Sequence, residues 1–228
     1  MQLLRFSGRL IQFIMIGLMG LIFVAVGVFL GVIASRDAAV EADRVEAMAA
    51  LDLAAFERGE PGSGALVEGV LSARNPARFR DFVAYVREEY HGKDSDGDDD
   101  WREDERVTPP LLVDLGGGVV QVANGTYRIT RYHGQWDDGG VVYWNGITGE
   151  GSKRYAGLVA GRPLLVIGTV QAGPEGNQIQ ADLVFAGSQA EYVAGQRDTA
   201  RFLPFFGMIF GAVGLILLGF GVRKLLRG

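Results

Sequence analysis

Carboxylates crowd into one short segment, "HGKDSDGDDDWREDE" at residues 91–105, which contains eight Asp and Glu residues. Oxygen ligands at this density can bind a hard cation such as Ca²⁺. Aspartates alternate from position 94, and a glutamate stands at the twelfth position from there, which is the ligand spacing of an EF-hand loop. The candidate ligands are Asp94, Asp96, Asp98, Asp100 and Glu105.

The same segment departs from the EF-hand pattern where the loop must bend. The sixth position, which is glycine in EF-hands, is Asp99, and the ninth position is Arg102. Pro109 and Pro110 also prevent a long helix from following the loop. Because blocks of like charge are usually solvated, we interpret the segment as an exposed loop tip and keep Ca²⁺ binding as the alternative.

Other residue types that carry chemistry are scarce. The sequence has no cysteine, and its two histidines, His91 and His133, lack the spacing of metal ligands. The segment "GEGSK" at 149–153 lacks the full spacing of a phosphate-binding loop, and no G-x-S-x-G nucleophile motif occurs. We therefore expect a protein that is not an enzyme and that has no cofactor, apart from the Ca²⁺ alternative.

Two apolar stretches lie near the ends of the sequence. Residues 11–35 and 202–222 contain no charged side chain over 25 and 21 positions. The hydrocarbon core of a bilayer takes about 20 apolar residues in helical conformation. A buried helix of a water-soluble domain seldom runs this far without a polar face. We therefore predict two transmembrane helices, which makes the lipid bilayer the first expected partner.

The residues between the two stretches are acidic, whereas the ends are basic. Positions 36–201 hold all 27 acidic residues and carry a net charge of −10, and the ends carry five basic residues and no acid. Basic residues beside a span favour the cytoplasmic side, so we expect both termini in the cytoplasm and the central domain outside it. The acidic middle also argues against nucleic acid as a partner.

Glycines recur at short helical spacings within both apolar stretches. They are Gly27 and Gly31 in the first stretch and Gly207, Gly211 and Gly214 in the second. Small residues at this spacing let the backbones of two helices approach closely. We predict that these glycines pack the two helices against each other, or against other membrane-protein subunits or further copies of the chain.

The region after the first stretch is helical at its start and then rich in β signals. Residues 36–60 are rich in Ala and Glu, which predicts that the first helix continues out of the membrane, and "EPGSG" predicts a linker. The predicted domains are an N-terminal transmembrane helix at 1–35, a juxtamembrane helix and linker at 36–64, an extramembrane β domain at 65–187, and a helix leading into the C-terminal transmembrane helix at 188–228.

Short apolar runs separated by turn residues indicate the strands of the β domain. The segment "ALVEGVL" predicts the first strand, and residues 109–132 predict a meander whose "NG" pair at 124–125 marks a tight hairpin turn. Residues 162–171 and 177–187 predict another strand pair. Residues 79–90 fit both an amphipathic helix and a strand, and periodicity alone slightly favours the helix.

The segments "VEGVLSAR", "TPPLLVDLGGGVVQV", "YAGLVAGRPLLVIGTVQ", "NQIQAD" and "FAGSQAEYVAGQRDTARFL" share a pattern of strands and glycines. Together they resemble the membrane part of the GIDE-type mitochondrial ubiquitin ligases over most of residues 10–222. The resemblance implies two transmembrane helices around a β-rich domain, with residues 79–90 as a strand. The zinc-binding ligase domain of that family is rich in cysteine. This chain has no cysteine, so ligase activity is not implied, and the chain resembles the prokaryotic members that lack that domain.

The sequence thus predicts a membrane α+β protein in which two transmembrane helices flank a small antiparallel, barrel-like β domain. The expected function is a membrane-anchored interaction or assembly module, such as an accessory subunit of a larger membrane complex. The alternative is a calcium-responsive or enzymatic extracytoplasmic domain that uses the acidic segment at 94–105.

Overall fold

The computed structural model describes residues 2–226 and divides into two compact units. The helical unit is formed by both ends of the chain, Met1–Ala47 and Ala190–Gly228, and the β unit by its middle, Met48–Gln189. The side-chain amide of Gln189 donates to the carbonyl oxygen of Met48 at 2.9 Å, so the two ends of the β unit lie side by side.

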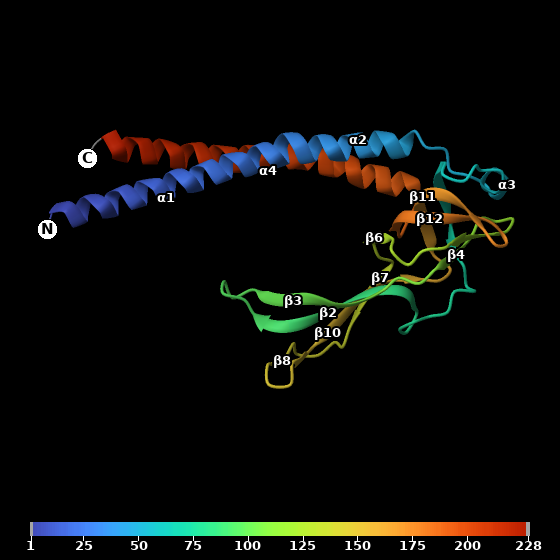
Figure 1. Cartoon of the computed structure of the whole chain (residues 1–228). Helices are drawn as coiled ribbons and strands as arrows, with labels where there is room; N and C mark the ends of the chain where they lie inside the picture. The colour runs from blue at the N-terminus through green and yellow to red at the C-terminus, as the bar shows by residue number, and fades with distance from the viewer. Residues whose placement is uncertain (1, 227–228) are drawn as a thin grey trace. The chain divides into compact units, whose positions relative to one another are not determined.

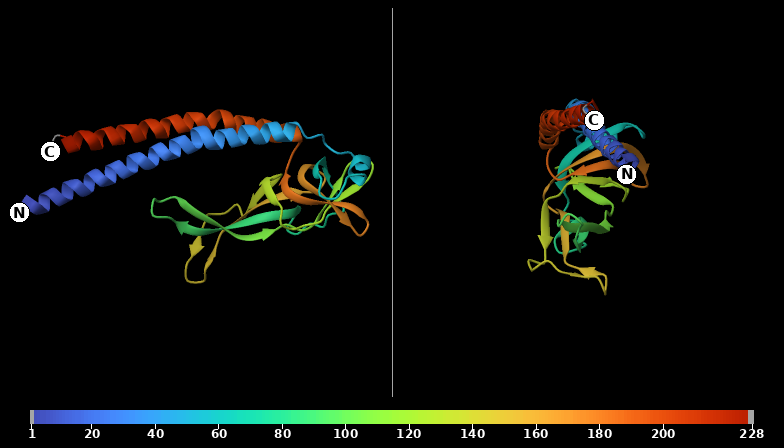
Figure 2. Two further views of the ribbon diagram at one scale, coloured as in Figure 1. Left: turned by 45° about the horizontal axis from the view of Figure 1, so that its top comes forward. Right: turned by 90° about the vertical axis from the view of Figure 1, so that its left-hand side faces the viewer.

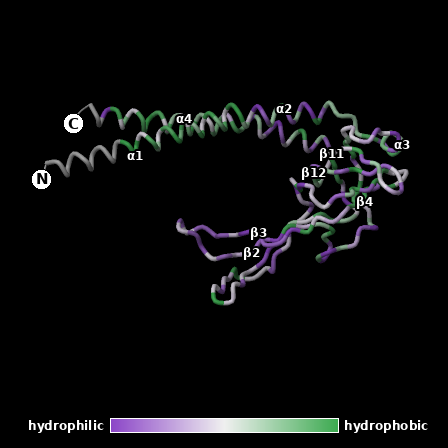
Figure 3. Tube along the Cα trace, in the orientation of Figure 1, coloured by the Kyte–Doolittle hydropathy of each residue, from purple (hydrophilic) through white to green (hydrophobic). Residues whose placement is uncertain are grey.

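Two long helical segments make up the helical unit (Figure 1). The first runs through α1 (Gln2–Val28), the π-helical turn η1 (Phe29–Ala34) and α2 (Ser35–Glu46), and the second is α4 (Gln189–Leu226). Both are long and apolar enough to cross a membrane, which confirms the predicted pair of long apolar helices. Figure 3 shows mainly hydrophobic residues along the coloured part of α1 and along most of α4, and mainly hydrophilic residues along α2.

A closed barrel of five strands forms the centre of the β unit. Its strands are β1 (Gly64–Leu71), β4 (Leu111–Asp114), β5 (Val119–Val122), β11 (Pro163–Gly173) and β12 (Gly176–Phe185). They pair in the order β11-β1-β4-β5-β12, and β12 closes the barrel by pairing with β11. This order, with a parallel contact between β5 and β12, is the topology of the OB-fold. The predicted barrel is therefore present, with parallel pairings on β12 as an exception to the antiparallel pattern.

The barrel is filled by aliphatic side chains that alternate with outward residues along each strand. Fully buried members include Val67, Leu111, Val166 and Ile179. The short helix α3 (Leu53–Glu57) adds Phe56 to this core. These contacts hold the barrel as a fixed base for the strands outside it.

A second sheet extends from the barrel, and we call it the arm (Figure 2). It contains β3 (Asp99–Val107), β2 (Phe82–Lys93), β10 (Lys153–Val159) and β7 (Gly134–Asp137), in that order, and the small hairpin of β8 (Trp144–Asn145) and β9 (Glu150–Gly151) adjoins it. Its strands are insertions between barrel strands, because β2 and β3 follow β1, and β7 to β10 follow β5. The arm thus brings together segments that lie far apart in the sequence.

One segment that the sequence left uncertain, residues 79–90, lies mostly in a strand. Residues 82–93 form strand β2, as the family resemblance implied, and not the helix that periodicity favoured. Val83 and Ala84 are buried in the barrel core, whereas Phe82 and Tyr85 pack into a separate aromatic cluster. Burial on both faces is incompatible with an exposed helical face, so tertiary packing decides the conformation.

The predicted hairpin at 124–125 is wrong. Strand β5 and the short strand β6 (Arg128–Arg131) do not pair with each other, because both run parallel to β12. Between them, the Asn124 side chain donates to the carbonyl oxygen of Ala181 at 2.9 Å and accepts from its N–H at 2.8 Å. The Asn124 side chain therefore bonds the two backbone groups of Ala181 that a neighbouring strand would otherwise pair with. The first helical segment does continue past residue 35, but α2 ends at Glu46, and the remainder of 36–60 holds only the short helix α3, which begins at Leu53.

Candidate functional site

The predicted glycines bring α1, η1 and α4 into backbone contact within the helical unit. A Cβ atom added to Gly27 would lie 2.7 Å from the Gly207 carbonyl oxygen and from the Gly211 nitrogen. A Cβ on Gly207 would lie 2.6 Å from the Gly31 Cα atom. Only glycine allows this approach. A Cβ on Gly211 itself would meet nothing within 4 Å, so Gly211 contributes its backbone to the contact and does not depend on its missing side chain.

Sequence reasoning missed one glycine of this contact. Gly214 is one of the predicted glycines, but its contact on the first helix, Gly20, is not. A Cβ on Gly214 would lie 2.7 Å from the carbonyl oxygen of Gly20. The available signal was the seven-residue spacing, because Gly20 precedes Gly27 by the same interval that separates Gly207 from Gly214. The helix contact therefore repeats every two turns.

Polar side chains join the same two helical segments beyond their apolar parts. The Tyr192 hydroxyl lies 3.2 Å from a carboxylate oxygen of Glu41, and Arg197 pairs with Glu46 at 2.5 Å. Ala42 and Val45 are fully buried between these groups. The α2 and α4 segments are thus held together by interactions suited to water, and α1 and α4 by interactions suited to lipid.

The acidic segment forms the tip and one strand of the β2–β3 hairpin. A carboxylate oxygen of Asp94 accepts the backbone N–H groups of Asp96 and Asp98, at 2.9 and 3.0 Å. Residues 94–98 are therefore a tight turn, as expected for a solvated tip, whereas residues 99–107 are strand β3 and not loop.

The other predicted metal ligands have basic or hydroxyl partners. Asp100 pairs with Arg102 at 2.6 Å, which lowers the pKa of its carboxyl group. Glu105 pairs with Arg87 at 2.7 Å and accepts the hydroxyl of Tyr85 at 3.0 Å. Among residues 2–226, no group of three Asp, Glu or His side chains is placed so that it could hold a metal ion. The five candidate ligands are not brought together.

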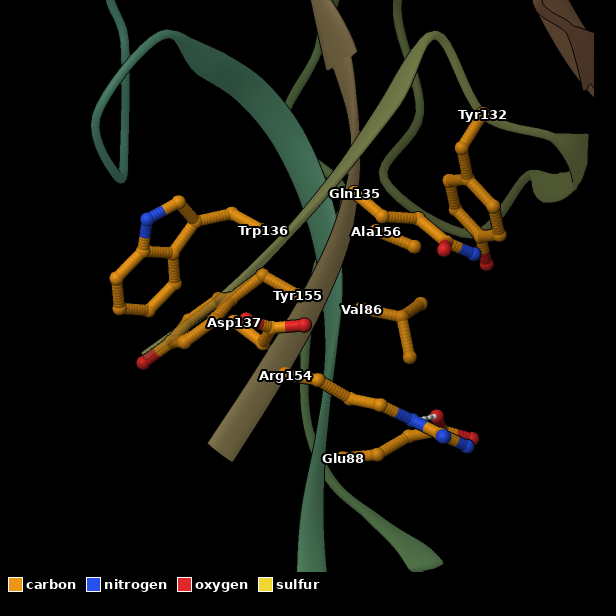
Figure 4. Close-up of a pocket in the computed structure, with 9 residues that line it drawn as sticks. All are labelled: Val86, Glu88, Tyr132, Gln135, Trp136, Asp137, Arg154, Tyr155 and Ala156. Atoms are coloured by element: carbon orange, nitrogen blue, oxygen red, sulfur yellow. Dashed lines mark hydrogen bonds and ion pairs between the residues drawn. The ribbon is translucent and has the colours of Figure 1, made fainter. Parts of the chain in front are cut away.

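A groove of about 380 Å³ runs across one face of the arm. It is lined by Val86, Glu88, Tyr132, Gln135, Trp136, Asp137, Arg154, Tyr155 and Ala156 (Figure 4). Strand register explains most of this set, because Ala156 lies between Val86 and Gln135, and the next row places Arg154 between Glu88 and Asp137. The groove therefore has an apolar floor beside a row of charges.

Arg154 dominates the charged row of the groove. Its guanidinium pairs with Glu88 at 2.5 Å and lies 4.3 Å from the ring centroid of Trp101 on β3. This combination of ion pair and cation–π contact fixes the guanidinium in place. Asp137 lies across the row on β7, which is an edge strand of the sheet. The groove thus adjoins backbone groups that no neighbouring strand pairs with in the described sheet.

Two residues of the groove lining, Trp136 and Tyr155, direct their rings to the other side of the strands from Val86, where they join an aromatic cluster (Figure 4). Phe79 stacks on Tyr155 with ring centroids 3.8 Å apart and planes 7° apart, and Trp136 meets Phe79 edge-on at 5.4 Å. Arg80, whose φ of 50° marks a strained backbone, places its guanidinium 3.9 Å from the Trp136 ring. Burial and the bond to Glu105 raise the pKa of the Tyr85 hydroxyl at the edge of the cluster. These rings stiffen the arm beneath the groove.

Residues 139–149 contain no charged side chain, and we call them the apolar tip; they comprise the segment that leads into β8 (139–143), β8 itself and the turn at 146–149 that joins β8 to β9. The base of this hairpin is fixed on β2 and β9. The N–H of Ser152 donates to the carbonyl oxygen of Tyr143 at 3.0 Å, and the Ser152 hydroxyl accepts from the Tyr143 N–H at 3.1 Å. The Trp144 ring packs on His91, with centroids 4.3 Å apart. The tip is therefore presented by a structured hairpin.

Neither the groove nor the apolar tip was singled out from the sequence. The groove depends on the register of three strands that the sequence does not align. The apolar tip had a readable signal, since eleven uncharged residues containing Val141, Val142 and Ile147 lie between Asp138 and Glu150 in an otherwise charged domain.

No protein-family model matches the chain, and a search of curated proteins finds no significant match.

Proposed function

We propose that the protein is a membrane-anchored binding module that helps to assemble or hold a larger membrane complex. The two apolar helices are the anchor, and the arm of the β unit is the binding element. The observation that carries the proposal is the groove beside edge strand β7, because it combines an apolar floor, a fixed guanidinium and unpaired backbone groups.

These features suit an extended polypeptide segment. Backbone groups of an edge strand can pair with an added strand, while side chains of the segment occupy the neighbouring groove. Ala156 leaves room on the floor of the groove, and the row of Glu88, Arg154 and Asp137 offers both signs of charge to a partner. The proposed partner is another membrane-protein subunit, or a second copy of this chain.

The same proposal includes the orientation of the chain and its family. Basic ends around an acidic middle support cytoplasmic termini and an extracytoplasmic β unit. The resemblance to the GIDE-type membrane domain is supported by a barrel that lies between two long apolar helices in the chain. Both statements concern this chain alone and do not extend to ligase activity.

Affinity purification from native membranes tests the proposal. The tagged full-length protein, extracted in mild detergent, is expected to recover one membrane protein at a fixed stoichiometry. Replacing Ala156 by Arg fills the floor of the groove and should remove that partner. Thr130→Arg, at an exposed position on β6 outside the groove, is the matched control and should keep it. Recovery without any stoichiometric partner, or a partner that Ala156→Arg retains, would contradict the proposal.

A further inference from the structure

We infer that the apolar tip, residues 139–149, inserts into the interfacial layer of the bilayer that the two long helices span. The inference rests on the proposed membrane anchoring but not on partner binding in the groove. It assigns to one arm two different surfaces, a groove for polypeptide and a tip for lipid.

The exposure of the tip is the first observation. Val141 is 91% exposed and Ile147 is 98% exposed, while Tyr143 and Val142 are 55% and 41% exposed. Within the described part of the β unit, Val70 on β1 is the other large apolar side chain of comparable exposure, at 40%. Clustered exposure of this kind marks a surface that meets an apolar environment.

Hydrogen bonds and close packing hold the base of the hairpin. The Gly151 N–H donates to the buried Glu89 carboxylate at 2.8 Å, and the Tyr90 N–H donates to the Ser152 carbonyl at 2.9 Å. A Cβ on Gly151 would overlap the Tyr90 carbonyl oxygen, so the hairpin base is pressed against β2. The base of the hairpin is therefore fixed on β2, and Ile147 lies in the turn beyond that base.

The composition of the tip favours lipid over a protein partner. It combines aliphatic residues with Tyr143 and Trp144, and Tyr and Trp are the side chains enriched where a membrane meets water. A narrow tip with four exposed apolar side chains offers little area against the roughly 800 Å² per partner of a stable protein interface. A bilayer requires no such area, because each inserted side chain contributes by itself.

Charge indicates which lipid surface the tip meets. The flanking residues include Asp137, Asp138 and Glu150, and the nearest basic residue after the tip is Lys153. Binding to anionic headgroups requires clusters of Lys and Arg, which this hairpin lacks. The tip therefore suits a neutral bilayer. The acidic turn at 94–98, at the end of the neighbouring hairpin of the same arm, suits water.

The connection of the β unit to the two long helices favours the contact. The β unit follows α2 and precedes α4 in the chain, so both of its ends are attached to the segments proposed to cross the membrane. Tethering at both ends of the β unit raises the effective concentration of the tip at the bilayer, so weak insertion is sufficient.

The absence of cysteine permits a direct test in the full-length protein. Single variants Ile147→Cys and Asp96→Cys are labelled with an environment-sensitive fluorophore and reconstituted in phosphatidylcholine nanodiscs, one copy per disc. A quencher attached to the lipid chains should quench the fluorophore at 147 and leave that at 96 unchanged. Iodide in the aqueous phase should quench the fluorophore at 96 and leave the fluorophore at 147 protected.

A second set of variants separates lipid insertion from protein contact. The fluorophore is moved to Val141→Cys in the background Ile147→Asp, where the insertion equilibrium should fall at least about tenfold because an apolar anchor becomes charged. Ser95→Asp, in the acidic turn, is the control background and should have no effect. A fluorophore at 147 as open to iodide as that at 96 would overturn the inference. Protection from iodide without lipid quenching would also overturn it, since protein would then cover the tip. Neither result depends on the fate of the groove variant Ala156→Arg.

Discussion

At the residue scale, Asn124 shows how one side chain completes the β12 edge of the barrel. Strand β5 stops pairing with β12 after Val122, and β6 begins only at Arg128. The Asn124 amide fills the interval by bonding both backbone groups of Ala181. The sequence "NGT" at this position also fits an N-glycosylation acceptor, but the amide nitrogen is already engaged within the β unit.

Replacing Asn124 by Ala should destabilise the β unit. The change leaves the N–H and carbonyl of Ala181 without partners, which costs about 1–3 kcal/mol of the free energy of unfolding. Chemical denaturation of the full-length protein in detergent, followed by the near-ultraviolet signal of the aromatic residues, measures the loss. Gln121→Ala, at an exposed position on β5, is the control and should change the free energy by less than about 0.5 kcal/mol. Equal values for the two variants would contradict the assignment.

His133 makes the stability of the β unit depend on pH. Its Nε2 lies 2.7 Å from the carbonyl oxygen of Pro163, which can only accept, so Nε2 carries the proton. Its Nδ1 accepts the N–H of Val159 at 3.0 Å and must stay unprotonated. Burial lowers the pKa of His133, and nearby Arg162 and Arg131 lower it further, whereas the bond to Pro163 opposes them.

The direction of this pH dependence follows from the lowered pKa. The folded state binds the proton less readily than the unfolded state, whose histidine titrates near 6.5. The contribution of His133 is therefore complete above pH 6.5 and is lost as the pH falls below that value towards the folded-state pKa. Melting temperatures between pH 7.5 and 5.5 should fall more steeply for the native protein than for His133→Gln. A variant of the other histidine, His91→Gln, serves as the comparison, and an unchanged slope in His133→Gln would refute the prediction.

At the element scale, the glycine contact between the two apolar helices makes a graded prediction. A methyl group on Gly207 would meet the backbone of Gly27 and Gly31, whereas one on Gly211 would meet nothing within 4 Å. Gly207→Ala should therefore lower the stability of the helical unit by about 1–3 kcal/mol, the usual cost of overpacking, while Gly211→Ala should be tolerated. Thermal unfolding in detergent, followed by helical circular dichroism, gives the comparison. Equal losses for both variants would mean that the helices do not cross at this point.

Local patterns predicted the elements whose partners lie nearby in the sequence. The long apolar helices and the β11–β12 hairpin follow from hydrophobic runs and a two-residue turn. The hairpin at 124–125 failed because "NG" favours a turn between adjacent strands, whereas here both strands pair with β12, more than fifty residues later. For residues 79–90 the helix favoured by periodicity was wrong for a related reason, since β2 contributes side chains both to the barrel core and to the aromatic cluster, which residues distant in the sequence complete.

The candidate sites show the same division. Glycine spacing identified most of the helix contact, because a helix brings i and i+4 to one face without help from other elements. The acidic segment suggested ligands that converge, but β3 is extended and alternates its side chains between two faces, where Arg87 and Arg102 pair with them. The groove could not be predicted, because Ala156 meets Val86 and Gln135 only through the register of the finished sheet.

At the scale of the whole molecule, both ends of the chain contribute to one helical unit while the middle forms the other unit. Because one apolar segment precedes the β unit and one follows it, the residues before the first and after the second share one side of any membrane that both segments cross. The five basic residues of the ends, with no acid among them, favour the cytoplasmic side. The proposed groove and apolar tip would then both act outside the cytoplasm.

This orientation can be tested in intact cells. A reporter inserted at residue 100 should be active only in its extracytoplasmic form, and reporters fused to either terminus only in their cytoplasmic form. Replacing Arg223 and Lys224 by Glu weakens the basic end after the second span and should raise the fraction of chains with an inverted C-terminus. Arg128→Glu, which alters charge within the β unit, is the control and should leave every reporter unchanged. A cytoplasmic reporter at residue 100 would reverse the assignment. The arm would then be expected to bind its partner and the bilayer from the cytoplasmic side.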